Sequence, residues 1–172
     1  MISKRSKGPG VHVDLLETAR QILCRGDGAN PSQTDLRRSV STAYYALFHH
    51  ISLCCSDLLG RSEVKSLTRA KNQIYRSINH RDVTAACNTA KKPGLDFPKP
   101  VSDYAALFLS MYRSRCDADY DPTSEGNFNL PQVQNKIGEV EQAIQSFDAA
   151  DEDDRRAFAV LIVVKSAKSG SK

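Results

Sequence analysis

The sequence lacks several features that would place the protein in a common functional class. No apolar run approaches the ~20 residues needed to cross a bilayer, and the longest, Ala157 to Val164, instead predicts a buried closing element. The start of the chain has no signal-peptide pattern. The five cysteines are odd in number and lack the paired spacing of a disulfide framework. These absences predict a cytoplasmic, reducing setting without membrane contact.

Two common kinds of ligand site are also missing. The glycines are scattered at the expected helix ends, so there is no Gly-rich phosphate-binding loop. There is no Cys-x-x-Cys pair and no His-Glu-x-x-His motif, which leaves only loose metal-ligand candidates such as His50 and Cys54, one turn apart. The sequence therefore predicts neither a metal nor another cofactor. The cysteines are expected to be small buried hydrophobes.

The length and charge of the chain indicate one mildly basic domain. A chain of 172 residues can bury a sizeable core in a single domain. A net charge of +4 and a pI near 8.8 fall well short of the dense positive field of a dedicated duplex-DNA binder. Part of this charge lies in residues 1–10 and 166–172, which we expect to be a disordered basic arm and a disordered basic tail. The single helical domain is expected to span residues 11–165.

Apolar residues within this span recur at helical spacing. Capping residues, glycines and prolines divide the pattern, with Asp82 and Ser102 as two of the expected N-caps. The segment Arg155 to Lys165 is rich in β-branched residues, which permits a strand, but the acidic run before it favours a helix. The pattern predicts an all-α bundle of about six to seven helices. The expected helices span residues 11–24, 31–60, 62–79, 82–90, 103–119, 130–147 and 155–165.

The long helix after Asn30-Pro31 has two stripes of side chains on opposite sides. The apolar stripe, which predicts the core-facing side, consists of Leu36, Val40, Ala43, Leu47, Ile51, Cys54 and Leu58. The polar stripe, whose members fall within about 60° of each other on a helical wheel, consists of Arg38, Thr42, Tyr45 and His49. A solvated helix back does not need aligned Tyr and His, so the polar stripe is expected to face a site or a partner.

A later helix carries an arginine in an unusual place. Arg115 continues the apolar stripe of Tyr104, Phe108 and Met111, so it should point inward or at a partner subunit. Asp119 follows one turn later. An Arg115–Asp119 pair that only closes the helix end would contribute about 0.3 kcal/mol if exposed.

Two stretches resemble the motifs of HEPN-domain proteins. Arg38-Ser-Val-Ser-Thr-Ala-Tyr-Tyr-Ala-Leu-Phe-His49 is similar to the long-helix signature of this family, and Arg115-Cys-Asp-Ala-Asp-Tyr-Asp-Pro122 to the Arg-initiated motif on a later helix. Their order and separation match as well, and with a closing helix like Arg155 to Lys165 the resemblance covers about residues 32 to 165. It implies an antiparallel helical bundle that commonly dimerises across these two helices.

The resemblance also implies a range of functions. Many HEPN-domain proteins are metal-independent RNases, often toxins or defence effectors, whereas others bind nucleotides or are partners of small nucleotidyltransferases. In active members an Arg that holds the phosphate is followed a few residues later by a His that moves the proton. Here the positions after Arg115 hold Asp119, Tyr120 and Asp121, and tyrosine ordinarily titrates about three units above neutrality.

Two functions of different classes follow. In the first, a homodimer cleft binds RNA or a nucleotide and, if active, cleaves RNA as a metal-independent endoribonuclease of a toxin–antitoxin or defence system. Arg115 would hold phosphate, His49 would serve as acid or base, Asp119 would orient one of them, and Tyr120 would stack or hydrogen-bond. In the second, the polar stripe is a non-catalytic surface for dimerisation or for docking a partner such as a nucleotidyltransferase antitoxin.

Four further residues are expected to bind the RNA or nucleotide. Arg38 and Tyr45 lie on the polar stripe of the long helix, while Arg76 and His80 lie one turn apart in a later segment. Three of them have a structural alternative. Arg38 fits a solvated helix face, Tyr45 fits an interface aromatic, and His80 fits a helix end where a protonated imidazole complements the helix dipole.

Overall fold

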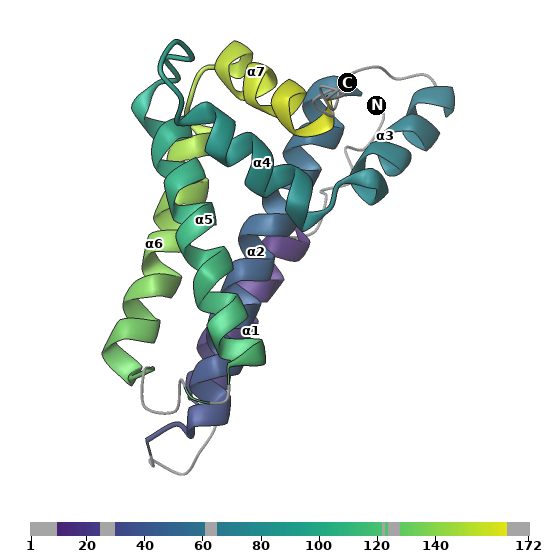
Figure 1. The fold of residues 1–172 in the computed structure, drawn as a ribbon. Coiled ribbons are helices and arrows are strands. Elements are labelled where there is room, and N and C mark those ends of the chain that lie inside the picture. Colours follow the sequence, from purple (N-terminus) through teal and green to yellow (C-terminus); the bar gives the residue numbers. More distant parts are fainter. Residues whose placement is uncertain (1–9, 25–29, 61–64, 122, 124–127, 165–172) are drawn as a thin grey trace, which may run out of the picture. The chain divides into compact units, whose positions relative to one another are not determined.

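A computed structural model describes residues 10–24, 30–60, 65–121, 123 and 128–164. These residues form helices and no strand (Figure 1). The seven helices are α1 (Val11–Leu23), α2 (Gln33–Leu59), α3 (Lys65–Ser77), α4 (His80–Ala90), α5 (Lys99–Tyr120), α6 (Leu130–Asp148) and α7 (Glu152–Val163). The prediction of an all-α helical bundle is confirmed, and α7 shows that the β-branched segment near the C-terminus is helical. The expected arm and tail lie outside the described residues, apart from Gly10.

The described residues divide into two compact units. Unit 1 contains those within Met1–His50 and Ser110–Gln142, and unit 2 those within Ile51–Leu109 and Ala143–Lys172. Three helices, α2, α5 and α6, contribute residues to both units. The single domain expected over residues 11–165 stays a prediction. No helix of the described part is long and apolar enough to span a membrane.

In unit 1, α1 lies antiparallel to the first part of α2. Near the end of α1 the carbonyl of Ala19 accepts a hydrogen bond of 2.7 Å from the Ser39 hydroxyl. Near its start the ring of His12 meets the ring of His50 edge-on, with 5.2 Å between the ring centroids. The start of α1 thus contacts a later residue of α2 than the end of α1 does. The two helices therefore run in opposite directions.

The same argument makes α2 antiparallel to the last part of α5. The Arg37 guanidinium donates to the carbonyls of Ala118 and Asp121, at 3.2 and 3.0 Å. Two turns further along α2, Tyr45 contacts Arg115, which is earlier on α5. Arg37 therefore satisfies carbonyls at the end of α5 that have no partner within the helix. These hydrogen bonds also fix the register between α2 and α5.

Unit 2 has an aromatic core. The ring centroid of Phe147, on α6, lies 4.6 Å from that of Tyr104 and 6.0 Å from that of Phe158. All three rings are completely buried. Phe97, just before α5, meets Phe158 edge-on at 5.9 Å. Side chains of α5, α6 and α7 thus share one core, where such aromatic pairs add to the stabilisation from apolar burial.

Three expected helix starts are wrong by about one turn, and one of them is α7, which begins at Glu152 rather than at Arg155. The cap of α4 is Asn79, whose side-chain oxygen accepts from the backbone N–H of Asp82 at 3.0 Å and whose amide donates to the Asp82 carboxylate at 2.7 Å. Asp82 therefore lies in the first turn, as the reciprocal partner of the cap. Likewise α5 begins at Lys99 rather than after Ser102. Pro100 fits this first turn because N–H groups there have no partner within the helix.

The expected buried side of α3 is only partly confirmed. Ile78 is buried, but it lies beyond the end of the helix, Ile74 is half-buried, and Ala70 is exposed. The side chains of Val64 and Leu67, which belong to the same predicted stripe, lie outside the described residues.

The expectation that the cysteines are buried is correct for some of them only. Cys55 and Cys87 are buried, Cys54 and Cys116 are half-buried, and Cys24 is exposed.

Candidate functional site

Arg115 lies on the last part of α5, in unit 1, and points inward, which is one of the two orientations that the sequence predicts. Met111, one turn earlier, is completely buried, and the side chain of Arg115 is only 14% exposed. An arginine is rarely placed in such a position without partners that satisfy its charge and its N–H groups. The contacts of Arg115 therefore define the site.

Three side chains surround the guanidinium. Its Nε lies 2.7 Å from Oδ2 of Asp119, an ion pair whose angle is too bent for a hydrogen bond. Its Nη2 donates to the hydroxyl oxygens of Tyr45 and Tyr120, both at 3.1 Å. The guanidinium carbon also lies 5.7 Å from the ring centroid of Tyr45 and 5.0 Å from that of Tyr120, within the range of cation–π attraction. We call these four residues the Arg115 cluster.

The charge of Arg115 is secured by this cluster. Burial alone lowers the pKa of an arginine, because it disfavours the charged form. The opposite effect comes from the electrostatic interactions with Tyr45 and the Asp119 carboxylate and from the hydrogen bonds to Tyr45 and Tyr120. This effect is stronger than that of burial, so the pKa of Arg115 is raised above its ordinary value. The site therefore contains a permanent positive charge.

Asp119 is itself held in place from α2. The hydroxyl of Ser41 donates a hydrogen bond to Oδ1 of Asp119, while the other carboxylate oxygen faces Arg115. Ser41 is 9% exposed, so this bond lies at the edge of the core. The expected role of Asp119 in orienting Arg115 or His49 stays a prediction.

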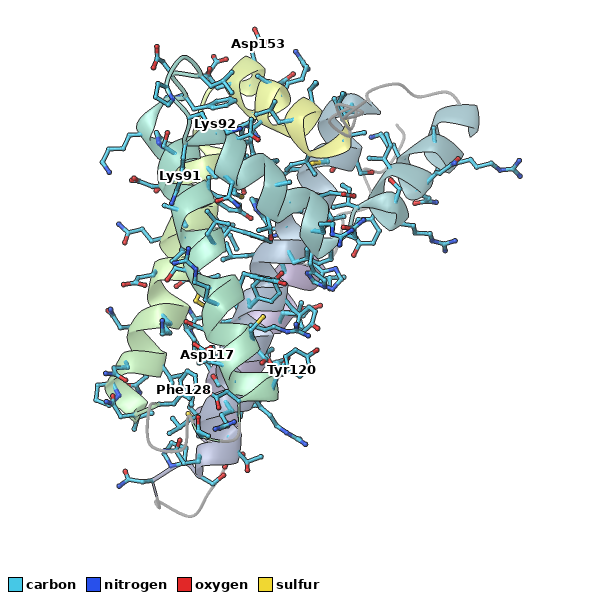
Figure 2. The ribbon with its side chains drawn as sticks, in the orientation of Figure 1. Lys91, Lys92, Asp117, Tyr120, Phe128 and Asp153 are labelled. Atoms are coloured by element: carbon cyan, nitrogen blue, oxygen red, sulfur yellow. The ribbon has the colours of Figure 1, made fainter. Side chains whose placement is uncertain are left out.

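A polar groove opens beside the cluster. It has a volume of about 400 Å³ and is lined by Thr34, Arg37, Arg38, Ala118, Asp119 and Tyr120. We call it the Tyr120 groove, because Tyr120 is 70% exposed and lies at the last turn of α5 with its ring outside the ribbon (Figure 2). Arg38 is exposed. The guanidinium of Arg37, by contrast, is engaged with the carbonyls at the end of α5.

One edge of the Arg115 guanidinium remains for a ligand. A guanidinium has N–H donors on Nε, Nη1 and Nη2. The contacts of Arg115 with the described residues use Nε and Nη2, and Nη1 is not among the buried atoms that lack a partner. Among the described residues Nη1 therefore has no partner, while the edge with Nε and Nη2 is held by the cluster. The Tyr120 hydroxyl, having accepted from Arg115, can still donate its own proton.

His49 is the expected acid or base, and it lies one turn after Tyr45 on α2. It is half-buried, and burial lowers the pKa of its imidazole, so the neutral form is favoured. In the described part of the chain the partners of Arg115 are Tyr45, Asp119 and Tyr120, and His49 is not one of them. The structure thus brings together Arg115, Asp119, Tyr120 and Tyr45, but it does not join His49 to them.

Arg76 and His80 lie in unit 2, on two different helices. Arg76 is in the last turn of α3, which ends at Ser77, and His80 is the first residue of α4. The expectation of one continuous helical turn between them is therefore wrong. The structural alternative for His80 is also wrong, because a protonated imidazole is favourable at the C-terminal end of a helix and not at its start.

Two residues of the site were not predicted from the sequence. Ser41 holds Asp119, and Arg37 caps the end of α5 that forms one side of the groove. Both adjoin residues of the polar stripe, and Ser41 lies between Arg38 and Tyr45. Thr42, which was included in that stripe, instead donates a hydrogen bond of 2.7 Å from its hydroxyl to the carbonyl of Arg38.

Comparison with protein-family models, with curated proteins and with solved structures found no match to this chain. The relationship to HEPN-domain proteins therefore stays a prediction that rests on the quoted motifs. The expectations of no metal and no other cofactor stay predictions as well.

Proposed function

We propose that this chain is an RNA-binding helical protein in which the Arg115 cluster and the Tyr120 groove hold one phosphate and one base of a single-stranded RNA. The observation that carries the proposal is the position of Arg115. Its guanidinium is permanently charged, is fixed along one edge by Tyr45, Tyr120 and Asp119, and has no partner for Nη1 among the described residues. Such an arginine suits an oxyanion, because its donors are oriented before the ligand arrives.

The exposed aromatic ring extends the argument from phosphate to nucleotide. Tyr120 offers a ring for base stacking beside the charge, and stacking on aromatic side chains is a main source of affinity for single strands. Arg38, which lines the same groove from α2, adds a second positive charge. The similarity to HEPN motifs supports the same class of ligand.

Binding is better supported than cleavage. The groups that contact Arg115 are two phenols and a carboxylate, and neither type ordinarily exchanges protons near neutral pH. His49 lies one turn after Tyr45 on α2 and is half-buried, whereas the neighbouring His50 is buried; the neutral form of His49 could accept a proton if an RNA spanned the distance from Arg115. We therefore propose RNA binding as the function and treat metal-independent cleavage as a separate outcome of the same experiment.

The test is the affinity of the purified protein for a labelled single-stranded RNA of about 12 nucleotides, a length within the range of single-strand binding sites. Fluorescence anisotropy in EDTA compares the parent with Arg115→Ala. Arg113→Ala is the matched control, because Arg113 is an exposed arginine two residues earlier on the same helix. We expect Arg115→Ala to weaken binding by about tenfold or more, the value of a lost charge-assisted hydrogen bond, and Arg113→Ala by about twofold or less.

The same samples, run on a denaturing gel, report cleavage. Strand breaks made by the parent and not by Arg115→Ala would extend the function to an endoribonuclease. Intact RNA with Arg115-dependent binding would leave a binding protein. A parent that binds no RNA, or variants that bind equally, would refute the proposed function.

The exposure of Tyr120 also favours a second function, a non-catalytic interaction module. An exposed tyrosine beside a polar groove is a common anchor of protein interfaces, and the partner would be a second copy of the chain or an antitoxin such as a nucleotidyltransferase. Light scattering after size-exclusion chromatography tests the homodimer. A dimer that Tyr120→Ala converts to monomer would support this function, and a monomer at micromolar concentration would exclude the homodimer.

A further inference from the structure

We propose that α3 has a second RNA-contacting surface, separate from the Arg115 cluster. The α3 basic face consists of Thr68, Arg69, Asn72, Gln73 and Arg76, which together line a groove of about 500 Å³ in unit 2. The inference extends the proposed function and rests on it for the kind of ligand. Its evidence comes from α3 alone.

The composition of α3 is unusual for a surface helix. Its sequence, KSLTRAKNQIYRS, contains two lysines, two arginines and no acidic residue. Surface helices commonly mix charges of both signs at positions one turn apart. A helix with basic residues only has a positive field that neighbouring carboxylates on the same helix do not cancel.

One side of α3 is used to hold the helix against the end of α2. Lys71 Nζ lies 3.2 Å from the Asp57 carboxylate, and the Ser56 hydroxyl donates to the carbonyl of Lys71 at 3.0 Å. The contact is close, because a Cβ added at Gly60 would lie 2.4 Å from Cγ of Lys71. The Lys71 side of α3 therefore packs within unit 2.

The two arginines lie on the other side of the helix. At about 100° per residue, Arg69 and Arg76 fall roughly 160° and 140° from Lys71. Both are exposed, and in the described part of the chain no carboxylate is paired with either of them. They are seven residues apart, so they share a face with about 10 Å between them along the axis.

The residues between the arginines favour a nucleic acid over a membrane surface. Asn72 and Gln73 are exposed amides, which can donate to and accept from base edges while arginines contact phosphates. A membrane-binding helix instead needs an exposed apolar side to insert among lipids, and Ile74 and Tyr75 are both half-buried. We therefore assign the α3 basic face to single-stranded RNA, with two backbone phosphates near the arginines.

The test is RNA affinity as a function of salt for the Arg69→Ala/Arg76→Ala double variant. The matched control is Lys91→Ala/Lys92→Ala, which removes the same charge from exposed lysines just after α4 (Figure 2). Each phosphate contact with a single strand contributes about 0.7 to the slope of log affinity against log salt. We expect the arginine variant to lower that slope by about 1.4 and the affinity at low salt by about tenfold or more, while the control changes the affinity by about twofold or less.

The outcomes separate this inference from the proposed function. If Arg115→Ala weakens RNA binding but the α3 variant matches the lysine control, the α3 surface is wrong and the proposed function stands. A parent that binds no RNA overturns both. If the α3 variant loses binding to phosphatidylserine vesicles and keeps its affinity for RNA, the face binds membranes and the inference is also overturned. Equal melting temperatures of parent and variants exclude a folding defect.

Discussion

Replacing Asp119 by asparagine separates two effects of its carboxylate on Arg115. The carboxylate stabilises the fold through its ion pair, and it also competes for Arg115 with any phosphate that binds. Asparagine has the same shape and can still accept from Ser41, so the change removes mainly the negative charge. We therefore expect Asp119→Asn to lower the stability of the protein and to raise its affinity for RNA.

The structure sets the size of the stability effect. An exposed pair at this spacing would contribute about 0.3 kcal/mol, but the Arg115 and Asp119 side chains are only 14% and 29% exposed. Water screens this pair less, which places its contribution near the top of the usual range, about 1 kcal/mol. In a chain of this size that loss lowers the melting temperature by about 2–4 °C. Circular dichroism measures it directly.

The effect on binding has the opposite sign. A phosphate on Nη1 of Arg115 would lie roughly 6 Å from the Asp119 carboxylate. At that distance in a well-hydrated groove the repulsion is on the order of 1 kcal/mol, so its removal should raise the affinity for RNA about fivefold. Anisotropy with the same labelled RNA measures the gain.

The matched control is Asp117→Asn, which changes the net charge equally on the same part of α5 (Figure 2). It should shift the RNA affinity much less, because Asp117 is not a partner of Arg115 in the described structure. If Asp119→Asn instead weakens RNA binding as much as Arg115→Ala does, Asp119 positions Arg115 and does not compete with the ligand. The reasoning above would then be wrong.

Three other predictions follow from single contacts or from burial. Arg37→Ala removes the hydrogen bonds to carbonyls at the end of α5 and should cost about 1–2 kcal/mol in urea denaturation; an unchanged midpoint would show that water replaces them. Burial raises the pKa of the Cys87 thiol to about 12, so little reactive thiolate is present at about pH 8. Iodoacetamide should therefore label the exposed Cys24 and leave Cys87 unlabelled until the protein unfolds. Mass spectrometry of the labelled protein measures this. Because burial lowers the pKa of His49 from 6.5, the free energy of unfolding should fall as pH drops below about 6.5, and His49→Gln should reduce that dependence; equal pH profiles would contradict it.

The sequence was informative wherever a pattern repeats along one helix. The apolar stripe predicted α2 almost to its ends. The alignment of Arg115 with Met111 predicted an arginine that points inward or at a partner subunit, and its side chain is only 14% exposed. The ion pair with Asp119 followed from its one-turn spacing. In each case the evidence lay within a few residues of the prediction, so the geometry of a single helix was sufficient.

Contacts between distant segments could not be predicted in this way. Ser41 and Asp119 are partners 78 residues apart, and nothing in either local pattern indicates the register at which α2 meets α5. The start of α4 was wrong for a different reason. Asn79 and Asp82 are both good capping residues, and the choice between them depends on where the chain leaves α3 rather than on the residues themselves.

The position of Arg115 leads to one direct measurement. In protein labelled with ¹⁵N at arginine, the side-chain signals of Arg115 and Arg113 are assigned with the Arg115→Lys and Arg113→Lys variants and followed during titration with single-stranded RNA. We predict that the Arg115 signal shifts and saturates at the affinity found by anisotropy, while the Arg113 signal stays nearly constant. An Arg115 signal that does not move when the RNA is fully bound would show that the RNA binds elsewhere on the protein.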